Sequence, residues 1–265
     1  MRPRKRFGQH FLHDTRVLQQ IASAVHLRPD DLLMEIGPGQ GALTEYLYPA
    51  NVARYVAVEI DRDLAPRLNA RYPNMEVINS DILRLDLASV LNSSEQAHPP
   101  WRLVGNLPYN ISSPLILKLV DHVIANPGSI QDMHFMLQKE MANRLSAVPG
   151  SKAWGRISVM AQIAMNVDYL FDVGPESFRP PPKVDSSIIR IRPLATPKLT
   201  VPKARLDQIL RLAFAGRRKR LSNALKALQL DWLALDLDPS LRADDVSIEK
   251  FLAIAHWVDA REDAI

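Results

Sequence analysis

The stretch that decides the fold is Leu32-Leu33-Met34-Glu35-Ile36-Gly37-Pro38-Gly39-Gln40-Gly41-Ala42-Leu43-Thr44. An apolar run followed by a glycine-rich turn and a helix start is typical of a parallel strand that ends at a ligand site. Glycines let the backbone approach a ligand closely, in conformations that a Cβ would forbid. The spacing Gly37-x-Gly39-x-x-Ala42 also fits a relaxed dinucleotide fingerprint, so the turn alone does not name the cofactor. It is not a Walker phosphate loop, because the Gly-Lys-Ser/Thr ending is missing.

From residue 31 onward, short β-like runs alternate with amphipathic helical stretches. This alternation predicts an α/β fold in which helices cover both faces of a parallel sheet. The expected strands are 31–36, 54–60, 75–80, 102–106 and 133–137, and the expected helices between them are 42–47, 63–71, 82–91 and 114–124. Further on, we expect a helix over 157–167 and a late strand pair, 169–173 and 187–192, of the kind that is often antiparallel at a sheet edge.

The pattern changes after Pro193, where Pro197 and Pro202 punctuate a linker and helical periodicity returns over 205–214, 218–228 and 247–260. We therefore expect three parts: a basic N-terminal arm over residues 1–16, a catalytic α/β domain over 17–193 and a small helical domain over 194–265.

The composition excludes several chemistries. The chain has 265 residues, 47% of them apolar and 23% charged, which is typical of a globular protein. It has no cysteine, so disulfides, thiolate zinc sites, cysteine-held iron–sulfur clusters and cysteine nucleophiles are excluded. His10 and His13 lack a partner ligand at metal spacing, so no metal is expected. No apolar run approaches the roughly 20 residues of a membrane span, and the basic start lacks a signal-type apolar segment, so we expect a cytoplasmic protein without a membrane partner.

Charge is unevenly distributed along the chain. Residues 1–16 contain five Lys/Arg and one acid, residues 176–226 contain thirteen Lys/Arg and three acids, and the net charge of the whole chain is only +4. Two basic segments on an otherwise acidic body favour nucleic acid as a partner. The residues expected to contact RNA are Arg4, Lys5, Arg6, Lys183, Arg217, Arg218, Lys219 and Arg220.

Three acids at successive strand ends favour S-adenosylmethionine (AdoMet) over NAD. Glu35, two residues before the first glycine, suits a cofactor with an ammonium and a sulfonium, whereas it would repel a pyrophosphate. Glu59, at the second strand end, can accept both ribose hydroxyls. At the third strand end, Asp81 can accept from the adenine amino group, and Ile82 can cover its face. The expected cofactor residues from these strand ends are Glu35, Gly37, Gly39, Glu59, Ile60, Asp81 and Ile82.

The fourth strand is followed by the tetrad Asn106-Leu107-Pro108-Tyr109, which can orient an adenine amine for methylation. The exocyclic amine of adenine is a poor nucleophile, because its lone pair is delocalised into the ring. If the Asn106 side-chain oxygen and the Leu107 carbonyl each accept one N–H, the lone pair points at the methyl sulfonium. Pro108 stiffens the turn, and Tyr109 can stack on a displaced base. Phe178, in a proline-rich loop, is expected to supply a second face for that base.

These residues, together with matching runs over 4–12, 133–140, 154–162, 178–186 and 217–223, resemble the bacterial small-subunit rRNA adenine N6,N6-dimethyltransferases. The resemblance implies a Rossmann-like seven-stranded methyltransferase domain, an arm that closes over the cofactor and a helical domain that binds rRNA. It further implies AdoMet contacts at His10, Leu12, Gly37, Glu59, Asp81 and Asn106. Family members often have Asn where this chain has His10.

The implied reaction transfers four methyl groups from AdoMet to two adjacent adenosines in a hairpin loop near the 3′ end of 16S rRNA. The implied substrate is the immature 30S subunit, and the implied enzyme is a monomer that also acts in subunit assembly. Two alternatives remain open at this point: a 23S rRNA methylase of the erythromycin-resistance type, and an assembly factor without catalysis. A DNA adenine methylase is disfavoured, because no DNA-target domain is recognisable.

Overall fold

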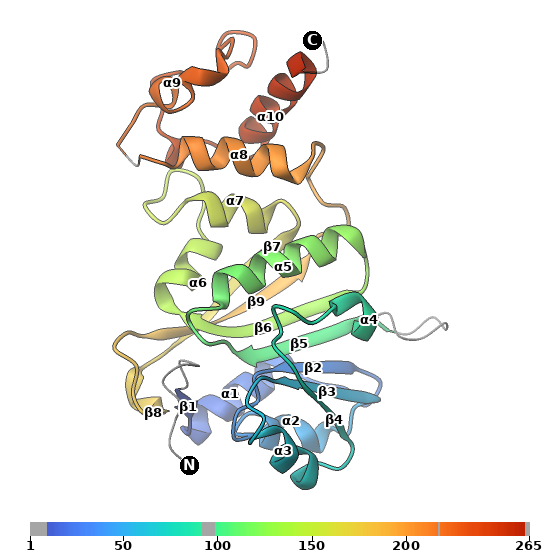
Figure 1. Ribbon diagram of the computed structural model, residues 1–265. Helices are drawn as coiled ribbons and strands as arrows, with labels where there is room; N and C mark the ends of the chain where they lie inside the picture. Colours follow the sequence, from blue (N-terminus) through green and yellow to red (C-terminus); the bar gives the residue numbers. More distant parts are fainter. Residues whose placement is uncertain (1–9, 92–98, 217, 263–265) are drawn as a thin grey trace. The chain divides into compact units, whose positions relative to one another are not determined.

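The structure, a computed structural model, describes residues 10–91, 99–216 and 218–262. It divides into two compact units (Figure 1): Met1–Ala142 with Asn166–Ala195, and Asn143–Met165 with Thr196–Ile265. The segment Asn143–Met165 groups with the helical second unit, although it precedes the expected boundary at residue 193.

Within the described residues, the first unit is built on seven strands in the order β4-β3-β2-β5-β6-β9-β7. The strands β2 to β6 pair in parallel, and β9 is antiparallel to β6. Their bounds are β2 Leu32–Ile36, β3 Arg54–Glu59, β4 Met75–Asn79, β5 Trp101–Asn106, β6 Ile130–Gln138, β7 Met165–Val173 and β9 Ser186–Pro193. All five residues of β2 are buried, as expected of a central strand covered on both faces.

Helices supply that cover. Their bounds are α1 Thr15–Val25, α2 Thr44–Leu47, α3 Ala65–Arg71, α4 Leu87–Leu91 and α5 Ser112–Ala125, with α6 Lys139–Leu145 following β6 and 3₁₀ turns at Tyr48–Ala50 and Pro175–Ser177. Asp14 caps α1 by accepting from the N–H groups of Arg16 and Val17. The apolar residues of α1, α2 and α3 pack in one cluster with alternate residues of the strands, such as Leu33, Tyr55 and Val104. Helix α5 buries seven residues of its own.

The direction of the chain reverses beside β2. The chain adds β3 and β4 on one side of β2 and then returns to place β5 on the other. Open parallel sheets bind ligands at the carboxyl edge beside such a switch point. Gly105 on β5 makes this close approach possible, because a Cβ there would lie 2.6 Å from the Ile36 carbonyl oxygen.

A second, two-stranded sheet joins distant parts of the chain. β1 (Phe11–Leu12) pairs antiparallel with β8 (Phe178–Arg179), and the His13 N–H donates to the Ser177 carbonyl at 2.9 Å. The described end of the N-terminal arm is therefore a paired strand of the first unit.

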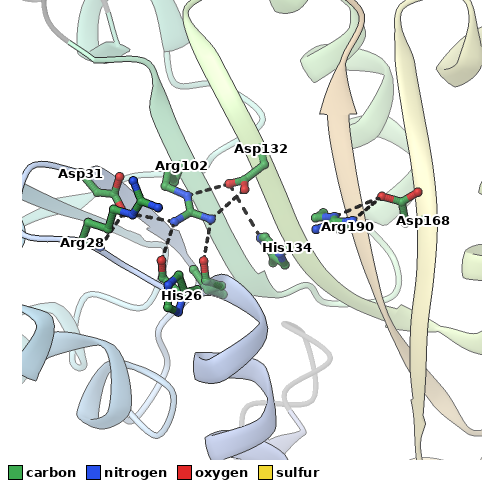
Figure 2. A network of polar contacts seen from close by, with 9 residues as sticks. His26, Arg28, Asp31, Arg102, Asp132, His134, Asp168 and Arg190 are labelled. Carbon is green, nitrogen blue, oxygen red and sulfur yellow. Dashed lines mark hydrogen bonds and ion pairs between the residues drawn. The ribbon is translucent and has the colours of Figure 1, made fainter.

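A buried polar network fastens α1 to the sheet (Figure 2). The Arg102 guanidinium on β5 donates to both carboxylate oxygens of Asp132 on β6, at 2.9 and 2.7 Å, and to Asp31 at 3.1 Å. It also donates to the carbonyls of Val25 and His26 at the end of α1. The guanidinium thereby satisfies two orphan carbonyls of a helix terminus and two buried carboxylates.

The second unit is helical in its described residues, with α7 Arg156–Gln162, α8 Lys203–Ala213, α9 Leu221–Ala224 and α10 Ile248–Glu262, and 3₁₀ turns at Lys226–Leu228 and Ala243–Asp245. Arg156 on α7 pairs with Asp207 on α8 at 2.5 Å, and the Phe214 ring packs on the Phe251 ring of α10. The Trp154 indole N–H donates to the Val246 carbonyl at 3.0 Å.

Three expected helices are wrong in extent. The helix expected over 157–167 ends at Gln162, because Met165–Val173 is recruited as a strand beside β9. The helix expected over 82–91 begins only at Leu87, because Asp81 caps a separate turn before it. The helix expected over 218–228 is interrupted at Leu225 and ends where Gln229 adopts left-handed backbone angles. Helices α1 and α6 were not expected.

Candidate functional site

A cavity of about 360 Å³ lies at the carboxyl edge of the sheet in the first unit. Its wall includes the ends of β2, β3 and β5 and the residues that directly follow β4. Every residue that the sequence nominated for the cofactor lines it: His10, Leu12, Glu35, Gly37, Gly39, Glu59, Ile60, Asp81, Ile82 and Asn106. Leu107, Pro108 and Tyr109 line it as well.

The glycine turn forms one wall. Gly39 has φ +60°, a left-handed conformation that favours glycine, and a Cβ at this position would lie 3.2 Å from the Phe11 ring. Phe11 of β1 therefore packs directly over the turn. A side chain at position 39 would crowd the Phe11 ring, so the close packing of the arm on the turn depends on glycine at this position.

Glu35 lies deeper in this wall and is 2% exposed. Its Oε2 accepts from the Thr44 hydroxyl at 2.8 Å and from the Tyr55 hydroxyl at 2.6 Å. Burial raises the pKa of Glu35 to about 7, against the two hydrogen bonds that favour the carboxylate. The carboxyl group is thus poised to respond to a cation placed in the cavity.

Glu59 ties the glycine turn to the end of β3. Its Oε2 accepts from the Gly39 N–H at 2.9 Å, and its Oε1 accepts from the Asp61 N–H at 2.7 Å. Burial raises the pKa of Glu59, and these backbone bonds oppose the rise. Each carboxylate oxygen has further lone pairs, so the group remains able to accept the two hydroxyls of a ribose.

The end of β4 offers a carboxylate beside apolar surfaces. Asp81 uses Oδ1 to accept from the Leu83 N–H at 2.9 Å, and its Oδ2 lies 3.8 Å from Arg84. Ile82 is buried in the cavity wall, whereas Ile60 is 45% exposed although it is a large apolar residue. The cavity wall thus combines the Asp81 carboxylate with two large apolar side chains, Ile82 after β4 and Ile60 after β3.

Asn106 is oriented by the arm. Its Nδ2 donates to the His10 carbonyl at 3.1 Å, which leaves the Asn106 Oδ1 to accept from another group. The Nδ1 of His10 lies 2.8 Å from the Pro180 carbonyl oxygen, and the imidazole ring stacks on Tyr109 with centroids 5.8 Å apart. His10 therefore contacts Asn106 through its backbone and the proline-rich loop through its side chain.

Tyr109, the last residue of the tetrad, is held in place by a hydrogen bond. Its hydroxyl lies 2.8 Å from the hydroxyl of the buried Ser186, and burial raises the pKa of Tyr109. The structure does not bring Phe178 into this site. Phe178 is 2% exposed, packs in the apolar cluster with Leu12 and Leu18, and is absent from the cavity wall. In this structure the pairing with β1 accompanies a side chain that packs in the apolar core, and the role of Phe178 toward a base stays a prediction.

The basic residues that the structure describes are not among those that line the cavity. Lys183, Arg218, Lys219 and Arg220 are exposed. Arg4, Lys5, Arg6 and Arg217 lie outside the described residues.

Several cavity residues were not predicted from the sequence, among them Phe11, Ile21, His134, Met136 and Ile188. His134 on β6 is 3% exposed, and in the described part of the chain neither ring nitrogen has a hydrogen-bond partner. Burial lowers the pKa of His134 to about 4, so its ring is neutral at pH 7. Phe11, His134 and Met136 lie in the runs 4–12 and 133–140 that match the family, but no local pattern predicts which of their side chains reach the cavity, because only the tertiary fold brings these segments to it.

Across the described ranges, no group of three or more His, Asp or Glu residues is arranged to hold a metal ion. Likewise, none of the described helices is long and apolar enough to cross a membrane.

The sheet order, the glycine turn and the cavity define a Rossmann-like, AdoMet-dependent methyltransferase with a further helical unit. A family model described as "Ribosomal RNA adenine dimethylase" matches residues 1–260. The chain belongs to this family.

Relatives support this placement. Two relatives are named "Ribosomal RNA small subunit methyltransferase A", one from Pseudomonas aeruginosa and one from Chromohalobacter salexigens. They are 46% and 47% identical to this chain, and each match spans 96% of this chain and 94% and 91% of the respective relative. Among solved structures, a dimethyladenosine transferase from Plasmodium falciparum matches with a TM-score of 0.79 at 25% identity, over 96% of this chain and 98% of that one. The 23S rRNA methyltransferase ErmE matches with a TM-score of 0.66 at 28% identity, over 94% of this chain and 99% of that one.

Proposed function

We propose that the protein transfers methyl groups from AdoMet to the N6 atoms of two adjacent adenosines in the hairpin loop near the 3′ end of 16S rRNA. The products are N6,N6-dimethyladenosines, and the substrate is the immature 30S subunit. The observation that carries this proposal is the tetrad Asn106–Tyr109 at the wall of the cofactor cavity. The choice of the small subunit is supported by relatives at 46–47% identity that carry it in their names.

The residues of the cavity fit the cofactor in shape and charge. Glu59 receives the ribose hydroxyls, Asp81 and the apolar Ile60 and Ile82 receive the adenine, and Glu35 favours the cationic end. When bound, AdoMet supplies a methyl group on a positively charged sulfur, which is an electrophile.

The tetrad then orients the target base. The Asn106 Oδ1, left free by the bond from Nδ2 to His10, accepts one N–H of the adenine amine, and the Leu107 carbonyl accepts the other. The amine lone pair is thereby directed at the methyl group, and Tyr109 stacks on the base. Each transfer would break the sulfur–methyl bond and leave S-adenosylhomocysteine. The nitrogen becomes acidic as it gains the methyl group and loses one proton to water, so no strong base is needed.

The decisive experiment incubates the full chain with labelled AdoMet and 30S subunits that lack these methyl groups, and then identifies the labelled nucleosides. We expect N6,N6-dimethyladenosine from 16S rRNA, with Asn106→Ala still binding 30S but transferring no label. Label in 23S rRNA would assign the chain to the resistance methylases instead. Binding of 30S without any label from the wild type would leave only an assembly role.

We also propose that the enzyme has a second role in assembly of the small subunit, and that it acts as a monomer in the cytoplasm, where the particle is made. Sedimentation of the free protein at micromolar concentration tests the monomer: a dimer mass would refute it.

A further inference from the structure

The turn after β4 is built around Asp81. The Asp81 carbonyl accepts from the N–H groups of Arg84 and Leu85, both at 2.9 Å, while its Oδ1 accepts from the Leu83 N–H. This turn carries Asp81 and Ile82 into the cavity wall. Its carbonyl oxygens face the opposite way and need donors of their own.

Lys118 on α5 supplies those donors. Its ammonium donates to the carbonyls of Ile82 at 3.0 Å and Leu83 at 2.9 Å, and also to the carbonyl of Leu85. An ammonium has three N–H bonds, so these three backbone acceptors match its full donor capacity. Burial lowers the pKa of Lys118, whereas the nearby charges of Asp81 and Asp86 raise it.

The same short turn is therefore fixed by two groups. Asp81 accepts from the backbone N–H groups of residues 83–85, and Lys118 donates to the carbonyls of residues 82, 83 and 85 from a helix 33 to 36 residues further along the chain. Lys118 itself is not among the described residues that line the cavity. It therefore acts on a bound molecule through the turn that it holds and not by direct contact.

We infer that Lys118 is a positioning residue for the adenine base of AdoMet. By fixing the backbone of residues 82–85, it holds the Asp81 Oδ2 and the Ile82 side chain where they recognise the amino group and the face of the base. The inference rests on the proposed function, because that function places adenine at this turn.

The test is calorimetric binding of two probes to the full chain. One is S-adenosylhomocysteine, and the other is its inosine analogue, in which an oxygen replaces the amino group of the base. Lys118→Met keeps the apolar stem but removes all three donors. We expect a loss of roughly tenfold in affinity for the adenosyl probe. This is the size expected when the charge-assisted bond between the Asp81 carboxylate and the amino group of the base is lost. The inosyl probe should lose far less, so the preference for adenosyl shrinks.

The matched control is Lys250→Met. Lys250 also donates to backbone carbonyls, those of Leu235 and Asp236, but in the second unit. We expect this change to leave both affinities unaltered. Lys118→Arg, which retains donors, should recover part of the adenosyl preference, and it keeps the test valid if Lys118→Met folds poorly. Equal losses for both probes, or none, would overturn the inference.

Asp81→Ala separates this inference from the proposed function. Loss of the adenosyl preference in Asp81→Ala but not in Lys118→Met would refute only the role of Lys118. An unchanged preference in Asp81→Ala would show that adenine does not lie at this turn, which overturns both the site and the inference. Failure of the wild type to bind either probe would refute AdoMet as the cofactor.

Discussion

Folding disfavours the ionised form of Glu35. Its pKa is about 7 in the folded chain and 4.5 in a reference peptide, because burial disfavours the carboxylate. Below pH 4.5 both states are protonated and the group costs nothing. As the pH rises to 7, the unfolded chain releases a proton that the folded chain retains, so stability falls. This difference amounts to roughly 3 kcal/mol at neutral pH and above.

We therefore expect Glu35→Gln, which is neutral at every pH, to be more stable than the wild type at pH 8 and to match it more closely at pH 5. Urea unfolding at pH values between 5 and 8 measures this. The difference between the two proteins isolates Glu35 from other titrating groups. Parallel stability curves for the two proteins would show that the pKa of Glu35 is not raised by folding.

His134 is a buried side chain whose two nitrogens have no hydrogen-bond partner in the described part of the structure. Such a group costs about 1–3 kcal/mol of stability. We expect His134→Leu to raise the free energy of unfolding by roughly 1 kcal/mol, since the apolar side chain needs no partner. His122 is the control: it is buried too, but lies 3.1 Å from the Ser129 hydroxyl. His122→Leu should destabilise the chain. Destabilisation of the same size in both variants would contradict this prediction.

The residues of the site divide according to what a sequence can reveal. Glu35, Glu59, Asp81 and Asn106 each follow an apolar run, and parallel strands bring their carboxyl ends to one edge, so pattern alone predicted that they would share a cavity. The direction of a side chain is different. Phe178 was expected in the site, but its pairing with Leu12 is a contact between residues 166 positions apart, which no local pattern encodes.

At the scale of elements, the Arg102 network joins β5, β6 and α1 (Figure 2). Arg102, Asp31 and Asp132 have side-chain exposures of only 7%, 11% and 9%. Removing one partner of a buried ion pair leaves an uncompensated charge and costs about 3–5 kcal/mol. We expect Arg102→Met to lose stability of this order, measured by chemical unfolding.

The control is Arg190→Met, which breaks the pair between β9 and Asp168 at 3.0 Å. Both side chains are more than one-third exposed, so the expected loss is below about 1 kcal/mol. If both variants lost the same free energy of unfolding, burial of the Arg102 network would not increase its contribution to stability.

Sequence patterns located the first four parallel strands better than the later elements: β2, β3, β4 and β5 lie within one residue of the expected bounds, whereas β6 begins three residues earlier than expected. The strands β2, β3 and β5 are buried on both faces for nearly their whole length, which gives them conspicuous apolar runs despite Glu35 and Arg102. The helix expected over 157–167 failed, because β7 lies at the sheet edge, where half-exposed residues give a weak pattern. Helix α1 was not predicted, although Asp14 caps it and Leu18, Ile21 and Val25 recur at helical spacing. This helical pattern lies before residue 31, where the β-α alternation begins, and beside the basic arm. The arm was interpreted by its charge, so the pattern was overlooked.

At the scale of the whole molecule, the basic cluster at 217–220 is the feature that long-range attraction to RNA would use. Each phosphate that the protein no longer neutralises should reduce the slope of log affinity against log salt by roughly 0.7–0.9. We expect Arg218→Ala with Lys219→Ala to weaken 30S binding and flatten this slope by about one to two units. Arg62→Ala with Lys152→Ala removes two charges outside the basic segments and should change neither. An unaltered slope in the first pair would show that the cluster does not touch RNA.

The pairing of β1 with β8 also has a consequence for the newborn chain. Phe11 and Leu12 leave the ribosome early, but their partners Arg179 and Phe178 are made much later. At about 5–20 residues per second, the interval is on the order of ten to thirty seconds. During that time Phe11 lacks the strand partner that holds it over the glycine turn. The enzyme therefore completes its own cofactor cavity only late in translation, when most of the helical unit is still to be made.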